Sequence, residues 1–176
     1  YIIMVQVNYD WNYNSKIKDI DRIFVVTHKD WFKEGKYSVN MSRPPLESLI
    51  EQSSMVESYA VLEGNIASEI TVADGNDNRT YELNTMQVTS GAYSVFGIEA
   101  VAGTFKGIGE ENVVAISEKT SRRLNLKLGD VIQLENEKSK RTVSAIFKNM
   151  PTNSIFGETD LLYSNLYEKQ SLENYS

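Results

Sequence analysis

β-Branched and aromatic residues in this chain come mostly in short runs, and glycine, asparagine, aspartate and proline separate them. This pattern predicts short strands rather than long helices, because turn residues interrupt each run after a few positions. The clearest pair of runs covers residues 69–73 and 79–88. Residues 74–78 join them, and their Asp-Gly and Asn content suits a hairpin loop.

Two further segments precede this hairpin. Residues 23–27 form an apolar β-branched and aromatic run after a charged stretch, which predicts a buried strand. Residues 44–51 begin with two prolines, which suit the first turn of a helix. Leu46, Leu49 and Ile50 then recur on one face, so a short amphipathic helix is expected there.

The second half of the chain predicts a strand, a helix and another hairpin. Residues 113–116 are fully apolar and end at Ser117, which is a good N-cap for a helix over residues 118–124. Residues 131–134 and 141–147 then read as paired strands. With no repeat of fixed period, the chain is expected to be an α+β protein of mostly short strands.

Composition narrows the possible functions. The 176 residues are 41% hydrophobic and 24% charged, as in ordinary globular domains. A net charge of -6 argues against nucleic acid as a partner. The chain has no cysteine, which excludes disulfides, thiolate metal sites and cysteine nucleophiles, and a single histidine leaves few options for histidine catalysis.

The hairpin loop has a partial calcium-binding pattern. Asp74, Asn76 and Asn78 have the spacing of the first three ligands of a calcium loop. The glycine and the bidentate glutamate that such a loop needs are replaced by Arg79 and Thr85. A plain hairpin loop is therefore the better interpretation, and no metal site is predicted.

Two other features resemble catalytic or cofactor sites only weakly. Gly103, Gly107 and Gly109 are not followed by the lysine and hydroxyl residue of a phosphate-binding loop. His28 has no second histidine or cysteine with which to complete a zinc site, and no nucleophile elbow accompanies it. The sequence predicts no catalytic residue and no cofactor site.

An aromatic group near the start is the one candidate partner surface. Tyr9, Trp11 and Tyr13 alternate, as residues on one face of a strand do, and could bind a sugar or a partner. The alternative is that these aromatic side chains pack at a boundary between lobes.

Residues 1–7 are apolar, and they predict either a first buried strand or the end of a transmembrane helix in a longer parent protein.

The order of segments resembles the extracytoplasmic core domain of MacB/FtsX-type ABC transporter permeases, in the versions found in Bacteroidetes-like bacteria. The resemblance covers nearly the whole chain and is carried by several weak motifs in the expected order. These are Tyr9-Asp10, residues 21–26, the Pro-led helix at 44–51, residues 95–98, residues 103–105, residues 113–118, Gly129-Asp130, residues 147–151 and Asn153-Ser154.

This resemblance implies a bilobed α+β domain between two transmembrane helices. A porter-like α/β lobe would contain residues 1–88 and 148–176, and a smaller, mostly β lobe would be inserted at residues 89–147. The domain would be periplasmic in an inner-membrane protein.

The resemblance also implies a mechanical function without catalysis. The domain would transmit ATP-driven motion to export or extract a peptide, lipid or lipoprotein, or to act on an envelope partner. Its partners would be a second permease copy and a cytoplasmic ATPase, separate or fused, that is reached through the transmembrane helices. A stand-alone extracytoplasmic protein that binds peptide or glycan is the main alternative, and an uncharacterised hydrolase is a more remote one.

Overall fold

The computed structural model describes residues 12–30, 33–39, 43–74, 77–108, 112–135 and 140–164. The helices in order are η1 (Ile20–Arg22), α2 (Arg43–Glu51), α3 (Ala92–Val95) and α4 (Glu118–Leu124). The strands in order are β1 (His28–Lys29), β2 (Tyr37–Ser38), β3 (Leu62–Asp74), β4 (Asp77–Val88), β5 (Ala100–Gly103), β6 (Val113–Ser117), β7 (Val131–Leu134), β8 (Lys140–Phe147) and β9 (Leu161–Ser164). The few helices and the large sheet confirm the α+β prediction.

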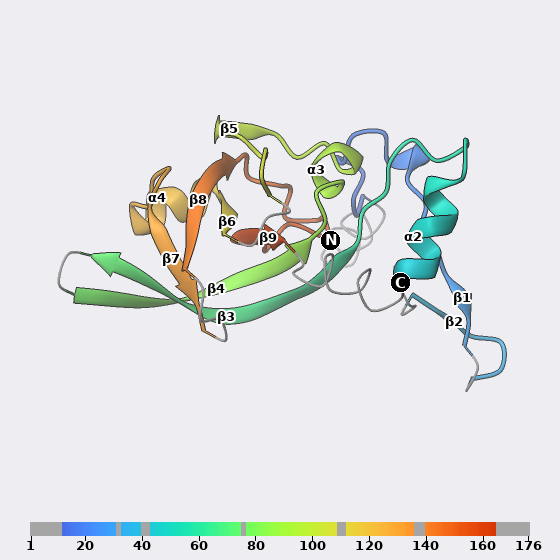
Figure 1. Ribbon diagram of the computed structural model, residues 1–176, viewed down its shortest axis with the longest axis horizontal. Coiled ribbons are helices and arrows are strands. Elements are labelled where there is room, and N and C mark those ends of the chain that lie inside the picture. Colours follow the sequence, from blue (N-terminus) through green and yellow to red (C-terminus); the bar gives the residue numbers. More distant parts are fainter. Residues whose placement is uncertain are drawn as a thin grey trace, which may run out of the picture.

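Strands β3 to β9 form one seven-stranded sheet with the order β5-β8-β6-β9-β4-β3-β7 (Figure 1). Because β7 also pairs with β8, every strand of this sheet except β5 belongs to a closed ring of pairings. The β4–β9 and β6–β8 pairs are parallel, and the others are antiparallel. β5 pairs with the second half of β8, outside the ring.

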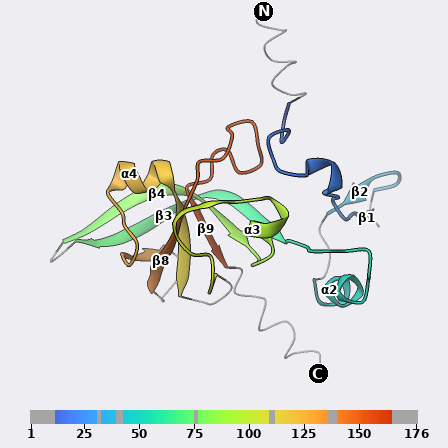
Figure 2. The same cartoon turned by 90° about the horizontal axis from the view of Figure 1, so that it is seen from above.

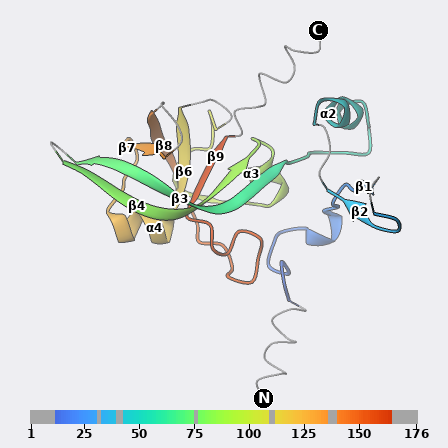
Figure 3. The same cartoon turned by 90° about the horizontal axis from the view of Figure 1, so that it is seen from below.

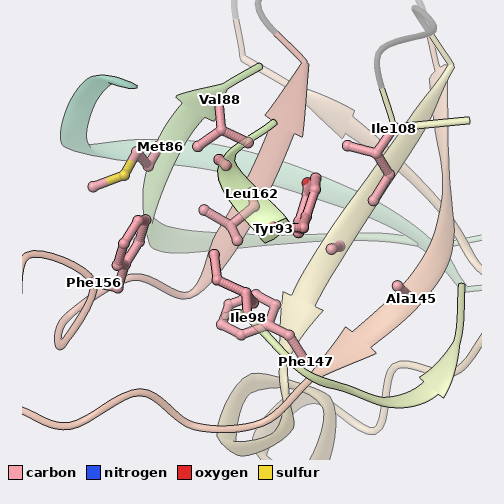
Figure 4. Packing of buried hydrophobic residues seen from close by; sticks show 11 residues of the cluster. Met86, Val88, Tyr93, Ile98, Ile108, Ala145, Phe147, Phe156 and Leu162 are labelled. Atoms are coloured by element: carbon pink, nitrogen blue, oxygen red, sulfur yellow. The ribbon is translucent and has the colours of Figure 1, made fainter. Parts of the chain in front are cut away.

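The core lies on both faces of β6 and β9. Val114 and Ile116 of β6 pack in one hydrophobic cluster, while Ala115 between them packs in the other. Adjacent strand residues point to opposite faces, so this strand is covered on both sides, which explains its unbroken apolar sequence. Figure 4 shows the cluster that contains Met86, Tyr93 and Phe147.

Most of the predicted elements are confirmed. α2 covers the predicted helix, and β3–β4 and β7–β8 form the two predicted hairpins. Ser117 is the N-cap of α4, and its Oγ accepts a hydrogen bond of 3.2 Å from the amide of Thr120. These elements depend on local sequence signals, such as capping and turn residues, that do not need a distant partner.

The strand predicted at residues 23–27 is wrong. The structure assigns no strand there, and Phe24, Val25 and Val26 are 83%, 75% and 49% exposed. The run has the residue types that strands prefer, but strand formation also needs a neighbouring strand, and none of the described residues pairs with this segment. Two short strands of the sheet, β5 and β9, were not predicted.

The two-lobe division stays a prediction. β9 pairs with β6 and β3 pairs with β7, so strands assigned to different lobes share one sheet, and the boundaries at residues 88 and 147 cut across it. Helices α3 and α4 pack with the strands of this sheet, whereas η1, β1, β2 and α2 lie apart from it. Figures 2 and 3 show them at one end of the molecule, opposite the tip of the β3–β4 hairpin.

Candidate functional site: a polar junction around the β8–β9 loop

The β8–β9 loop, residues 148–160, is where three parts of the molecule meet. It begins in the segment 147–151 that helped to carry the family resemblance. Its polar groups contact α4, the sheet strand β4, and residues 12–19 at the start of the described chain. We call residues 12–19 the strap. The loop and the strap lie next to one another in Figure 2.

Asp160, at the end of the loop, holds the loop to the sheet and to α4. Its Oδ1 accepts a hydrogen bond of 2.6 Å from the hydroxyl of Thr120, and its Oδ2 accepts one of 3.2 Å from the amide of Asn84. Its own backbone amide donates to the carbonyl of Asn84, and its carbonyl accepts from the amide of Ser117, both at 2.8 Å. Because Asp160 is only 5% exposed, these contacts replace the water that its carboxylate would otherwise need.

Two cations on α4 compensate the charge of this carboxylate. The Nζ of Lys119 lies 3.6 Å from Oδ1 of Asp160, and an Nη atom of Arg123 lies 3.7 Å from Oδ2. Both cations are about half exposed, so solvent screens them, while the hydrogen bonds from Thr120 and Asn84 are shielded. The arrangement fixes α4 against the loop.

The first turn of α4 receives a second contact from the loop. The side-chain Oδ1 of Asn149 accepts a hydrogen bond of 2.8 Å from the backbone amide of Lys119. Amides in the first turn of a helix have no partner within the helix, so Asn149 satisfies one of them. Ser117, through its contact with Thr120, satisfies another.

The strap binds the middle of the loop through three hydrogen bonds. The amide of Asn14 donates to the carbonyl of Asn153 at 2.8 Å, and Nδ2 of Asn153 donates to the carbonyl of Asn12 at 2.9 Å. The amide of Ile155 donates to Oδ1 of Asn14 at 2.9 Å. Asn14 and Asn153 thus hold residues that lie 141 positions apart in the chain.

The strap also lies against the turn that follows α3. Ile17 is buried, with 4% of its surface exposed. Gly97 has a φ of +61°, and a Cβ atom at that position would lie 3.1 Å from the Cβ of Lys18. Glycine therefore allows both the left-handed turn and the close approach of the strap. A cavity of about 260 Å³, lined in part by Lys18, Tyr93 and Glu99, lies between them.

Tyr93 is a buried titratable group beside the cavity. Its ring stacks on Phe105 with a centroid distance of 4.0 Å, and its hydroxyl has no hydrogen-bond partner among the described residues. Burial raises the pKa of Tyr93 far above the ordinary value for tyrosine, because the charged form would lose its hydration. Figure 4 shows its ring among apolar side chains of the cluster, in surroundings that suit a packing role.

The predicted partner surface is described only at Tyr13, which is 50% exposed. Tyr9 and Trp11 lie outside the described residues, so the aromatic surface stays a prediction.

The ring of His28 contacts the carbonyl of Lys29 at 2.8 Å, in the short β1–β2 hairpin. Within the described ranges there is no group of three or more metal-binding side chains, and no helix is long and apolar enough to cross a membrane.

The junction itself is not predicted by the sequence. Asn149, Asn153 and Asp160 were not singled out, although the first two lie within the motifs that carried the resemblance. A signal was present for Asp160, since it is a charged residue directly before the apolar run Leu161-Leu162.

Comparisons with known proteins agree with this architecture. The model of the MacB-like periplasmic core domain family matches residues 3–174. The structure resembles a domain assigned to a permease protein of Porphyromonas gingivalis, with a TM-score of 0.56 and 24% identity over 73% of this chain. The chain spans 60% of the length of that domain. A search of curated protein sequences found no match.

Two further structures match this chain with lower TM-scores. The periplasmic region of MacB from Actinobacillus actinomycetemcomitans has a TM-score of 0.44 and 17% identity, and the match covers 66% of this chain and 52% of that one. The extracellular domain of the noncanonic ABC-type transporter YknZ from Gram-positive bacteria has a TM-score of 0.45 and 14% identity, with 72% and 64% covered.

The family match over residues 3–174 and the α+β fold define the class of this protein as a periplasmic core domain. Within that class, the chain belongs to the family of MacB-like periplasmic core domains.

Proposed function

We propose that this domain is a non-catalytic mechanical element that transmits ATP-driven motion from the membrane to its own outer surface. ATP is hydrolysed by a cytoplasmic ATPase, separate or fused, and two permease copies act together in the inner membrane. The transporter moves a peptide, lipid or lipoprotein, or acts on an envelope partner. The observation that carries this proposal is the contact of the strap with the β8–β9 loop.

The strap can transmit force because it is connected to the sheet through the loop. Asn14 and Asn153 join strap and loop, and Asp160 joins the loop to β4 and α4. A displacement of the strap is therefore passed to a sheet whose strands are paired in a closed ring. Such a ring has few unpaired edges at which it can deform.

A soft boundary next to this ring also supports a mechanical function. Residues 52–61 connect α2 to β3, and we call them the linker. Residues 54–58 of the linker are exposed. Nearer the sheet, Val61 exchanges backbone and side-chain hydrogen bonds with Thr89, the hydroxyl oxygens of Ser58 and Ser94 are 3.2 Å apart, and Ala60 packs against the hydrophobic cluster. We propose that the part of the molecule with η1, β1, β2 and α2 moves relative to the ring of strands at this linker. This places the moving boundary near residue 61, and not at the predicted lobe boundaries of residues 88 and 147.

Distance measurements in the parent transporter test this function. The chain has no cysteine, so spin labels can be placed at Met55→Cys on the linker and Lys127→Cys after α4, both at exposed positions. The distance between the labels should change between the nucleotide-free and ATP-bound states. A control pair on the same side of the linker, Thr80→Cys in β4 with Lys127→Cys after α4, should keep its distance. An unchanged linker distance in a transporter that is turning over ATP would contradict the proposal.

A further inference from the structure

The backbone of the strap is held in an unfavourable conformation at two places. Asn14 has a φ of +61° and Asp19 has a φ of +52°. Among the described residues, Asn125 is the other non-glycine residue with a positive φ. Left-handed backbone costs free energy for residues with a side chain, although asparagine and aspartate tolerate it better than others. Such residues keep this conformation only where the surroundings impose it.

The contacts that impose it are open to water. The side-chain hydrogen bonds between the strap and the loop, made by Asn14 and Asn153, are exposed. Water can replace exposed hydrogen bonds at little net cost, so they resist opening weakly. Ile17 is the strap residue whose apolar side chain is buried, and it provides the main hydrophobic contribution.

The attachment of the loop to the sheet is different in kind. The hydrogen bond from Thr120 to Asp160 is buried, and the neighbouring Ser117 hydroxyl donates a second buried hydrogen bond of 2.8 Å to Thr120. Breaking these bonds would leave polar groups without water, which is costly. The weaker contacts therefore lie between strap and loop, and the stronger ones lie between loop and sheet.

We propose that the strap is a releasable element: residues 12–19 detach from the β8–β9 loop by breaking the Asn14–Asn153 contacts, while the loop, α4 and the ring of strands stay folded. Segments with few apolar contacts and exposed hydrogen bonds open locally at a lower free energy than the whole domain. The left-handed residues favour this opening, because their backbone relaxes when the strap is free. While the contacts are intact the strap is coupled to the sheet, and its release uncouples the two. The proposal deepens the proposed function and rests on it only for the use that the transporter makes of this uncoupling.

Hydrogen exchange on the full 176-residue chain tests the release directly. The amides of Asn14 and Ile155 should exchange faster than the amide of Ile116 in β6, and low concentrations of denaturant should not affect their rates, as local opening requires. Asn153→Ala should raise the exchange rate of the Asn14 amide about tenfold, because it removes the hydrogen bond from Nδ2 of Asn153 to the carbonyl of Asn12. Asp19→Val should also raise it, because a β-branched residue is strongly disfavoured at a positive φ.

A matched variant separates strap release from general loosening. Thr120→Val should speed exchange in α4 and β9 and leave the strap amides of Asn14 and Ile17 unchanged. The proposal is overturned if the strap amides exchange only with global unfolding, at the rate and denaturant dependence of Ile116. It is also overturned if Asn153→Ala accelerates exchange across the whole sheet.

A cross-link in the parent transporter tests whether release is used. A Cβ at position 97 would lie 3.1 Å from that of Lys18, a few tenths of an ångström closer than a disulfide needs, so Lys18→Cys with Gly97→Cys should lock the strap on oxidation after a small shift. Gly97→Cys alone is the control, because it places the same side chain at a positive φ without the cross-link. The oxidised form should lose transport, and reduction should restore it. Normal transport in the oxidised form would overturn strap release and leave the proposed motion at the linker intact, since that motion is measured separately.

Discussion

The hydroxyl of Thr120 donates a 2.6 Å hydrogen bond to the carboxylate of Asp160, and the two residues are 40 positions apart in the chain. Thr120 is fully buried in the first turn of α4, and Asp160 ends the β8–β9 loop. This one contact joins the helix to the loop that also holds the strap. The stability of the junction should therefore depend strongly on it.

Removing the Thr120 hydroxyl should destabilise the domain. A buried hydrogen bond to a charged group contributes about 1.5–3 kcal/mol, so Thr120→Val should lower the free energy of unfolding by about 2 kcal/mol. Asp160→Ala should cost about 3 kcal/mol, because it also leaves the amide of Asn84 without its side-chain acceptor.

The coupling between these two residues can be measured by urea denaturation. The double variant should lose less stability than the sum of the two single variants, since the two side chains form one contact. The control is Thr80→Val at an exposed position of β4, which should change stability by less than about 0.5 kcal/mol. Simple additivity of Thr120→Val and Asp160→Ala would show that the contact is not formed.

The segment from β6 to α4 could be predicted from the sequence, whereas the junction could not. Residues 113–124 contain an apolar run, an N-cap and a short helix, and each of these signals acts within a few residues. The hydrogen-bond partners of Asn153 and Asp160 lie far away in the sequence and come close only in the tertiary fold. A single sequence does not show which distant residues these are.

The exposed run at residues 23–27 was wrongly predicted as a strand because a local pattern does not show whether a partner strand is present. Its composition favours a strand, but strand formation requires another strand at hydrogen-bonding distance.

Arg141 is another residue whose surroundings cannot be predicted from the sequence. It is a charged residue at the start of β8, yet it points into the core beside the Tyr163 ring, 5.0 Å from the ring centre, with 0% of its surface exposed. Its strand pairs with β6 and β7, and a single sequence does not show these pairings.

Replacing Tyr93 with phenylalanine should maintain or increase stability. The hydroxyl of Tyr93 is buried, and no residue in the described part of the chain hydrogen-bonds to it. Tyr93→Phe therefore removes a desolvated polar group and keeps the stacking on Phe105. The expected gain at neutral pH is about 0–1 kcal/mol in the free energy of unfolding. Tyr37→Phe at an exposed position is the control and should have no effect. A loss of more than about 1 kcal/mol would reveal an interaction of the hydroxyl.

The same variant should change the response to alkaline pH. Burial raises the pKa of Tyr93 in the folded state, so the folded form retains this proton while the unfolded form loses it above about pH 10. The contribution of Tyr93 to stability is therefore complete below pH 10 and declines as the pH rises further. The stability advantage of Tyr93→Phe should grow above pH 10. An advantage that does not change with pH would show that Tyr93 titrates normally.

Gly91 should tolerate no side chain. A Cβ at this position would lie 1.9 Å from the carbonyl oxygen of Tyr59 in the linker, so Gly91→Ala must displace the linker from α3. We expect a loss of about 2–3 kcal/mol, as for other strained insertions in packed sites. Gly107→Ala is the comparison: it has a φ of +89° but open space around it, and should cost about 1 kcal/mol. Equal losses measured by thermal unfolding would show that the linker does not contact α3.

Motion at the linker is the central claim, and a reversible cross-link tests it most directly. The hydroxyl oxygens of Ser58 in the linker and Ser94 in α3 are 3.2 Å apart, so Ser58→Cys with Ser94→Cys should form a disulfide in the parent transporter. With the disulfide formed, transport should stop while cytoplasmic ATP binding continues, and reduction should restore transport. Full transport activity with the linker locked would contradict the mechanical account.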